Sequence, residues 1–336
     1  MKADNRVAGA TVRYTVMLAL LILICAASLR FGSSAMSTGE FIGALLRTDS
    51  YKTQSLILYS IRLPRMAGAL VAGIGLSVSG VLLQSVTANE LAAPNIIGVN
   101  SGAGFAVILT LFLFPAAFAA IPLAAFVGAF TATLIIVAAA NRISASKTAI
   151  VLAGIALTAM LNACISFITL LDTDTLASYN YFSIGGLAGV RVTELYIPAA
   201  ITLCCLALSL VIARRINLLA LGDAMACSLG VNVRRLRLIC LVLASASAAA
   251  VVSYAGLLGF VGLVVPHIAR RISGGSVREV LCTSAICGGI LVVAADLAGR
   301  VLFAPSEVPV GIIMAFIGAP FFFFLLFRRN GGSDKC

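Results

Sequence analysis

The sequence predicts an all-α integral membrane protein with about ten transmembrane helices. Three observations support this prediction: 61% of the 336 residues are hydrophobic, only 10% are charged, and the mean hydropathy is +1.12. A soluble domain carries about 25% charged residues, because water must solvate its surface. At about 20 residues a span, ten helices would use roughly 200 residues and leave the rest for loops. The composition excludes a disordered chain, a fibrous repeat and a soluble enzyme, and it predicts one polytopic membrane domain over residues 1–336.

The first apolar run, 14–31, is expected to be an uncleaved helix. Lys2, Arg6 and Arg13 precede this run, which is also the layout of a secretory signal peptide. However, the bulky Ile24 stands directly before Cys25, where lipoprotein processing requires a small residue, and many more apolar runs follow. These two features favour a first membrane span.

Nine further apolar runs are each expected to cross the membrane once. The stretch 95–140 is too long for one span, and Pro115 and Pro122 offer a place to turn. The run 257–269 is short, rich in glycine and contains Pro266, so by length alone it could be re-entrant. The nine runs are 66–86, 95–114, 116–140, 148–171, 195–213, 236–256, 257–269, 280–298 and 308–327.

The distribution of charge favours ten crossings with both termini in the cytoplasm. A net charge of +11 could indicate a nucleic-acid partner, but the basic residues are too scattered for that. In membrane proteins Lys and Arg are retained on the cytoplasmic side. An even number of crossings places Arg328, Arg329 and Lys335 with the basic N-terminus in the cytoplasm. The protein is expected to lie in the inner (cytoplasmic) membrane of the cell. The basic residues left outside, where acids nearly balance them, are Arg30, Arg47, Lys52, Arg62, Arg65, Arg191 and Arg300.

Several classes of chemistry lack their sequence motifs. No G-x-x-x-x-G-K-[ST] loop is present, so this chain is not expected to bind ATP through a Walker motif. A single histidine and cysteines without a C-x-x-C pair predict neither a metal site nor a cofactor. Ion-coupled carriers use buried ionisable residues; the clearest one here is Asp296, which an i,i+4 ion pair with Arg300 explains. We therefore expect a transport subunit, not an enzyme, that receives its energy from another subunit.

The long cytoplasmic segment 214–235 is the first candidate site. Its sequence predicts two short helical pieces, hinged at Gly222 and ended at Gly230, with Asp223 able to cap the second piece. Its apolar side chains lie outside the membrane and have too little local core in which to be buried. An exposed apolar helix of this kind usually binds a protein partner. A self-packed loop, or one lying on lipid headgroups, is the alternative. The contact residues are expected to be Leu218, Leu221, Gly222, Asp223, Met225, Leu229 and Gly230.

Three outer arginines form the second candidate site. Arg62 and Arg65 open the second span and Arg300 closes the ninth, so they meet on the side where positive charge is avoided. Their side chains could snorkel to lipid phosphates. Alternatively, they recognise a carboxylate-bearing partner or an anionic cargo outside the membrane, which suits the planar guanidinium group.

A set of short motifs, in order along nearly the whole chain, carries a family resemblance. The motifs are Arg62-Leu63-Pro64-Arg65, Leu91-Ala92-Ala93-Pro94, Gly98-Val99-Asn100-Ser101-Gly102-Ala103, Leu152-Ala153-Gly154-Ile155-Ala156-Leu157, Gly259-Phe260-Val261-Gly262-Leu263-Val264-Val265-Pro266-His267, Asp296-Leu297-Ala298-Gly299-Arg300 and Pro309-Val310-Gly311. This pattern resembles the FecCD-type permeases, the membrane subunits of ABC importers for ferric siderophores, haem and cobalamin. The chain departs from the family at Glu90, where proline is common, and at Phe182, where tryptophan is frequent.

The resemblance implies the architecture of a type II ABC importer permease, in which two ten-helix subunits, identical or homologous, enclose a translocation path. Two cytoplasmic ATPases would grip the segment 218–230. A substrate-binding protein would dock outside, with acidic residues facing Arg62, Arg65 and Arg300. The expected cargo is a ferric siderophore, with haem or cobalamin as the alternative and an ion-coupled secondary carrier as the alternative from another class. The residues expected along the path are Gln84, Asn100 and Ser101.

Overall fold

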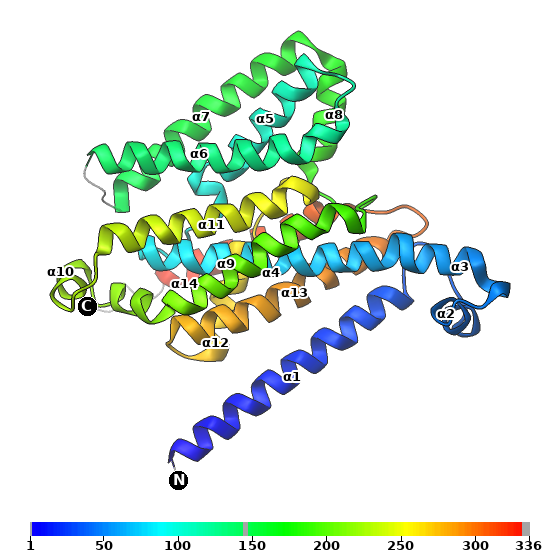
Figure 1. The fold of residues 1–336 in the computed structure, drawn as a ribbon, viewed down its shortest axis with the longest axis horizontal. Helices are drawn as coiled ribbons and strands as arrows, with labels where there is room; N and C mark the ends of the chain where they lie inside the picture. Colours follow the sequence, from blue (N-terminus) through cyan, green and yellow to red (C-terminus); the bar gives the residue numbers. More distant parts are fainter. Residues whose placement is uncertain (1, 144–146, 331–336) are drawn as a thin grey trace.

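The structure, a computed structural model, describes residues 2–143 and 147–330. Within these residues the regular elements are all helical (Figure 1). The α-helices are α1 (Lys2–Arg30), α2 (Thr38–Leu45), α3 (Lys52–Leu56), α4 (Leu63–Thr87), α5 (Val99–Leu113), α6 (Ile121–Ile143), α7 (Lys147–Leu171), α8 (Thr173–Ile184), α9 (Val192–Leu219), α10 (Asp223–Ser228), α11 (Val233–Ala255), α12 (Val261–Ser273), α13 (Val277–Val301) and α14 (Val310–Asn330). The shorter elements are the 3-10 turns η1 (Asp49–Tyr51), η3 (Pro94–Ile97) and η4 (Phe118–Ala120) and the π-helical stretch η2 (Ile57–Arg62).

Each predicted apolar run falls mainly on one α-helix, in the order α1, α4, α5, α6, α7, α9, α11, α12, α13 and α14. The runs 95–114 and 116–140 also include η3 and η4, and the run 257–269 begins in the loop before α12. In the described part of the chain, seven helices are long and apolar enough to cross a membrane. Two shorter apolar helices, Val99–Leu113 and Val310–Leu325, accompany them. The helix α12, with 13 residues, is the shortest of the ten. The all-helical membrane fold is confirmed, whereas a full crossing by every one of the ten runs stays a prediction.

The helix α4 lies at the centre of the bundle and packs against α9, α11, α12 and α13. Two glycines set how closely it approaches its neighbours. A Cβ atom at Gly73 would overlap the carbonyl group of Gly288 on α13, and one at Gly80 would overlap that of Gly262 on α12. Helices in lipid associate through such close backbone approach, because lipid tails are as apolar as the side chains. These glycines therefore hold α12 and α13 directly against α4.

The helices α5, α6, α7 and α8 form a second group that packs beside α11 (Figure 1). Backbone hydrogen bonds tie the end of α8 to two other elements. The amide of Leu257, after α11, donates to the carbonyl oxygen of Phe182 (3.2 Å), and the amide of Gly311, in the first turn of α14, donates to that of Gly185 (3.1 Å). Gly185 has a φ of +74°, which favours a residue without a Cβ atom. The ends of α8 and α11 and the start of α14 thus form one junction.

The bundle has two distinct ends, which we call the α2 end and the α10 end after the short helices found there (Figure 1). At the α10 end, Arg13 of α1 donates to the carbonyl oxygen of Ile272 (3.0 Å) and pairs with Glu279 (3.5 Å). The last turns of α14, at Phe321 and Phe324, line a small cavity together with the end of α12. The start of α1 and the end of α14 therefore lie at the same end of the bundle, as an even number of crossings requires.

The chain returns along α4 between the end of α11 and the end of α12, and α12 itself starts beside Gly80, past the middle of α4. At the end of α11, Tyr254 donates to the carbonyl oxygen of Gly68 (2.8 Å), toward the α2 end of α4. At the end of α12, Arg270 donates to Oε1 of Gln84, near the α10 end of α4. Sixteen helical residues separate these two contacts on α4, which is about 24 Å. This path favours a crossing segment over a re-entrant loop.

Candidate functional site

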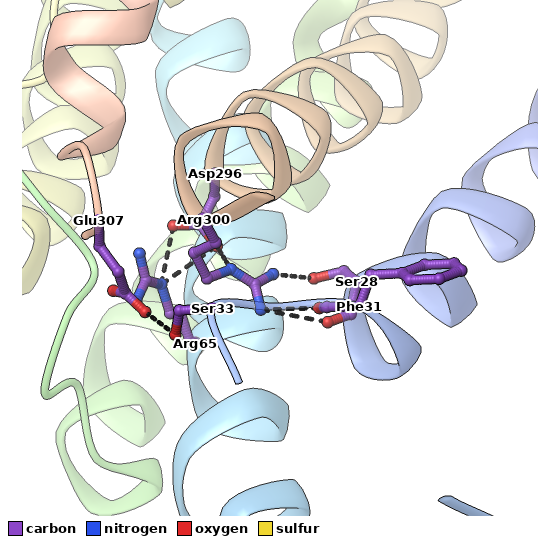
Figure 2. Close-up of polar contacts among 7 residues, drawn as sticks. All are labelled: Ser28, Phe31, Ser33, Arg65, Asp296, Arg300 and Glu307. Atoms are coloured by element: carbon purple, nitrogen blue, oxygen red, sulfur yellow. Dashed lines mark hydrogen bonds and ion pairs between the residues drawn. The ribbon is translucent and has the colours of Figure 1, made fainter. Parts of the chain in front are cut away.

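Arg65 and Arg300 converge on one carboxylate, that of Asp296 on α13 (Figure 2). Nε of Arg65 lies 2.9 Å from Oδ1 of Asp296, and Nε of Arg300, one turn further along α13, lies 3.0 Å from Oδ2. Asp296 is only 1% exposed, and a buried carboxylate is tolerated only when it is paired. The i,i+4 pair between Asp296 and Arg300 is confirmed. The second partner on α4 was not predicted.

Other donors of the outer arginines hold the end of α1. Nη2 of Arg300 donates to Oγ of Ser28 (2.6 Å). Arg62 donates from Nη1 to the carbonyl oxygen of Arg30 (2.7 Å) and from Nη2 to that of Ser34 (2.6 Å). The last carbonyl groups of a helix lack partners within the helix, and positive charge is favourable there. The arginines therefore cap the C-terminus of α1 and fix it against α4 and α13.

The three predicted docking arginines are buried in this structure. Arg62, Arg65 and Arg300 are 3%, 5% and 2% exposed, and their guanidinium groups bind protein groups. Snorkelling to lipid phosphates does not fit side chains that lie inside the protein. Contact with a docking protein stays a prediction, and such a contact must begin at the groups that cover these arginines.

Glu307 covers Arg65 on the side away from Asp296 (Figure 2). It lies in the loop 302–309 between α13 and α14, and about one-third of its side chain (32%) is exposed. Nη1 of Arg65 donates to Oε2 of Glu307, and Oγ of Ser33 donates to Oε1 (2.6 Å). Partial burial raises the pKa of Glu307, but the hydrogen bonds from Ser33 and Arg65 and the nearby positive charges outweigh it, so the pKa lies below its ordinary value. Sequence reasoning did not single out Glu307 among the acids expected outside.

The second candidate site lies at the α10 end. The side chains of Leu221, Met225 and Leu229 are 60%, 54% and 55% exposed. Gly222 (φ +91°) and Gly230 (φ +81°) bound α10 on either side, and both have a backbone conformation that favours glycine. We call Leu221, Met225 and Leu229 the apolar ridge. Its contact with an ATPase stays a prediction.

Two details of this segment differ from the sequence-based interpretation. The first predicted helical piece is not separate, because α9 continues unbroken through Leu218, which is half-buried. The predicted cap at Asp223 is wrong, because both carboxylate oxygens of Asp223 accept from Nη2 of Arg237 (2.7 and 2.8 Å). Arg237 lies on α11, is 8% exposed and also donates from Nε to the carbonyl oxygen of Val86 on α4 (3.3 Å). A buried guanidinium requires a counter-charge, and Asp223 supplies it.

The three residues predicted along the translocation path do not come together. Asn100 lines a cavity of about 370 Å³ between the end of α8 and the starts of α5, α12 and α14, where Asn95 and Ser183 are the other polar residues. Gln84 is buried near the α10 end beside Arg270. Ser101 is buried too, and its hydroxyl donates to that of Thr158 on α7 (3.2 Å). Of the three, Asn100 is the one that faces this cavity.

Glu90 marks the turn where the sequence departs from the family pattern. The residue Ala88, with a φ of +49°, ends α4, and the chain turns toward η3. The carboxylate of Glu90 is exposed, and its Oε2 lies 3.9 Å from Nδ1 of His267 on α12. The turn therefore has an acidic contact with α12 at the α10 end.

Comparison with known proteins assigns the chain to a family. A model of the FecCD transport family matches residues 20–328. The iron-uptake system permease protein FeuC of Bacillus subtilis (strain 168) is 32% identical over 96% of this chain and 99% of its own length. The ferric enterobactin transport system permease protein FepG of Escherichia coli (strain K12) is 33% identical over 95% of this chain and 97% of its own. The hemin transport system permease protein HmuU of Yersinia pestis is 34% identical, with 94% and 95% covered.

A solved structure agrees with this assignment. It is described as an inward-facing conformation of a metal-chelate type ABC transporter, and it superposes with a TM-score of 0.85 at 28% identity, covering 95% of this chain and 99% of that one. The family resemblance drawn from the sequence motifs is thereby confirmed. The chain belongs to the FecCD transport family and is a multi-pass inner-membrane permease of the ABC importer type, a transport subunit whose ATP is hydrolysed by a partner chain.

Proposed function

We propose that this permease moves a ferric siderophore across the inner membrane. Relatives named for iron uptake and for ferric enterobactin transport support an iron chelate as the cargo. The relative named for hemin transport is similar to the same degree and makes haem the second candidate. In either case the cargo is a bulky chelate, and the energy for its movement comes from a separate ATPase.

The apolar ridge on and beside α10 is the observation that carries the proposed coupling to an ATPase. An apolar helix surface that is exposed at the α10 end, with basic residues flanking it in the sequence, is typical of a protein interface on the cytoplasmic side. An ATPase that grips α10 would also move the transmembrane helices. Asp223 ties α10 to Arg237 of α11, and Arg237 contacts α4 in turn. Closure of the ATPase pair would thus reach the centre of the bundle through two short contacts.

The topology that we infer has ten crossings, with the α10 end in the cytoplasm and the α2 end outside. It is supported by the common position of the two chain ends and by the return of α12 along α4. Arg270, Arg271 and Arg278 lie at the α10 end in this arrangement, which agrees with retention of basic residues on the cytoplasmic side.

Outside the membrane, a substrate-binding protein would dock over Arg62, Arg65 and Arg300. These arginines gather at the α2 end, and two of them already bind carboxylates of this chain. A guanidinium group binds a carboxylate with two parallel donors, which a lysine cannot do. The partner is expected to present acidic side chains here.

A second permease subunit, either another copy of this chain or a homologue, would complete the translocation path. Asn95, Asn100 and Ser183 give the cavity at the α8–α14 junction an uncharged polar lining, which suits the passage of a bulky cargo that the binding protein has already selected. Gln84 and Ser101 are buried in helix contacts, so a path past them requires those contacts to open.

Co-purification and transport test the proposal together. A tagged chain expressed in its host should bring down an ATPase and a second permease subunit. Vesicles that contain this complex, with the binding protein outside the membrane, should take up one cargo from a panel of ferric siderophores, haem and cobalamin. Uptake of haem alone would select the second candidate. A chain that purifies alone and transports its cargo with an ion gradient would show a secondary carrier instead.

A further inference from the structure

The guanidinium group of Arg65 is shared between a deep and a shallow carboxylate (Figure 2). Its Nε faces Asp296, which is 1% exposed and is held by Arg300 as well. Its Nη1 faces Glu307, whose side chain is 32% exposed. Glu307 thus occupies the part of Arg65 that an approaching protein could reach.

We propose that Glu307 occupies the site on Arg65 that a carboxylate of the substrate-binding protein binds during docking. When that protein docks, its carboxylate replaces Glu307 on Arg65. The inference rests on the docking role proposed above and names its site. The ligand is an acidic side chain, and Ser33, whose Oγ now donates to Oε1 of Glu307 (2.6 Å), is the second donor that it would meet.

Replacing Glu307 needs little rearrangement, whereas replacing the groups that bind Arg62 and Arg300 would need a great deal. Arg62 and Arg300 donate to carbonyl groups at the end of α1 and just beyond it, which cannot leave without disturbing that helix. Asp296 is fixed between two arginines. Glu307 lies in a loop and is held by two side-chain donors, Arg65 and Ser33. A carboxylate that replaces it leaves Arg65 paired throughout, because Asp296 stays bound. No buried charge is uncovered at any stage, which is the main cost of breaking an ion pair in the interior.

The loop that carries Glu307 leads directly to the junction beside the cavity. Val308 remains attached, because its amide donates to the carbonyl oxygen of Gly299 (3.0 Å), and Gly311, four residues after Glu307, donates to that of Gly185 at the end of α8 (3.1 Å). Release of Glu307 therefore loosens the loop before Val308, whereas Val308 and Gly311 stay attached to α13 and to the end of α8. This short attached stretch connects the docking site to α8 and α14, which line the cavity.

The affinity of the binding protein for the assembled transporter in nanodiscs tests the exchange. Glu307→Gln keeps the shape of the side chain and removes its charge, so the internal competitor weakens. We expect the binding protein to dock about two- to fivefold more tightly, the range that corresponds to a partly exposed ion pair. Ser33→Ala removes a donor from Glu307 and from the incoming carboxylate alike, so it should leave the docking affinity close to the wild-type value. Arg65→Ala should abolish the gain in the double variant with Glu307→Gln.

Glu194→Gln is the matched control, because it removes the same charge from the start of α9, where the carboxylate accepts from the amide of Arg191 (3.3 Å) and not from Arg65. The affinity of the binding protein for the Glu194→Gln transporter should stay at the wild-type value. Equal tightening in both variants would show only a long-range charge effect, and unchanged or weaker docking by Glu307→Gln would overturn the exchange. If the wild-type transporter does not bind the protein at all, the docking proposal falls together with the exchange.

A spin label in the loop gives a second readout that does not depend on affinity. A label on Ser306→Cys, in a background without the native cysteines, should gain mobility when the binding protein docks to the wild-type chain. In the Glu307→Gln background the label should be mobile before docking. A label that is equally immobile in all four states would contradict release of the loop.

Discussion

Nε of Arg65 on α4 lies 2.9 Å from Oδ1 of Asp296 on α13, and the two residues are 231 positions apart in the chain. Both side chains are almost completely buried, at 6% and 1% exposed. Because Arg300 binds the other oxygen of Asp296 and also contacts Ser28 of α1, one carboxylate joins three helices. A charge buried in a membrane protein is costly unless it is paired, so this cluster defines how the α2 end is assembled.

Asp296→Asn should destabilise the protein strongly. The substitution keeps the shape of the side chain but leaves Arg65 and Arg300 buried with one acidic partner fewer, and losing one partner of a buried pair costs about 3–5 kcal/mol. A large fall in the midpoint of thermal unfolding in detergent would show it. Asp174→Asn, at an exposed position on α8, should leave the midpoint unchanged. Equal midpoints for the two variants would contradict a structural role of Asp296.

Leu221→Asp should release the ATPase without affecting membrane insertion. The substitution places a charge on the apolar ridge, and loss of an apolar anchor weakens an interface by at least about tenfold. Pull-down of the ATPase by the tagged permease measures this effect. Leu46→Asp, at a leucine that is 73% exposed at the α2 end, is the control and should retain the ATPase. Retention by both variants would show that α10 is not the contact.

The stabilising effect of Glu307 should depend on pH in one direction only. Its pKa is lowered from the ordinary value of 4.5 by Ser33 and Arg65 against the opposing effect of partial burial. A group whose pKa is lowered in the folded state stabilises that state above its unfolded pKa, and the effect is lost as the pH falls through the lower, folded value. The difference in unfolding midpoint between wild type and Glu307→Gln should therefore be constant from pH 7 to about 5 and should shrink below pH 4.5. A difference that grows in acid would contradict the pairing with Arg65.

A cysteine label should locate the loop between α12 and α13 on the cytoplasmic side. In a background without native cysteines, Ser276→Cys in intact spheroplasts should resist an impermeant thiol reagent and should react in inverted vesicles. Ser306→Cys, at the α2 end, should show the opposite pattern and report that the reagent works. Prompt labelling of Ser276→Cys from outside would refute ten crossings.

The helices and their order could be predicted from the sequence, because apolar runs of sufficient length have few alternatives in a membrane chain. The pair between Asp296 and Arg300 could be predicted as well, since a spacing of four residues fixes it within one helix. The attachment of Arg65 to the same carboxylate could not, because it depends on the packing of α4 against α13.

The rest of the site was out of reach for the same reason. Glu307 and Ser33 are 274 positions apart in loops without a motif, and only the folded chain brings them together over Arg65. The position of Asp223 after Gly222 fits a helix cap, but its carboxylate pairs instead with Arg237, a buried arginine on the next helix. The helix-cap prediction therefore failed because this buried cation, on another helix, needed a counter-charge.

Uptake into vesicles with a controlled energy source tests the central proposal most directly. Vesicles that hold the permease with its ATPase should import a ferric siderophore from the binding protein only when ATP is supplied on the ATPase side. Leu221→Asp should abolish this uptake, and collapse of the proton and sodium gradients should leave the wild-type rate unchanged. Uptake by the permease alone, driven by an ion gradient and indifferent to ATP and to Leu221→Asp, would contradict the proposal and identify a secondary carrier.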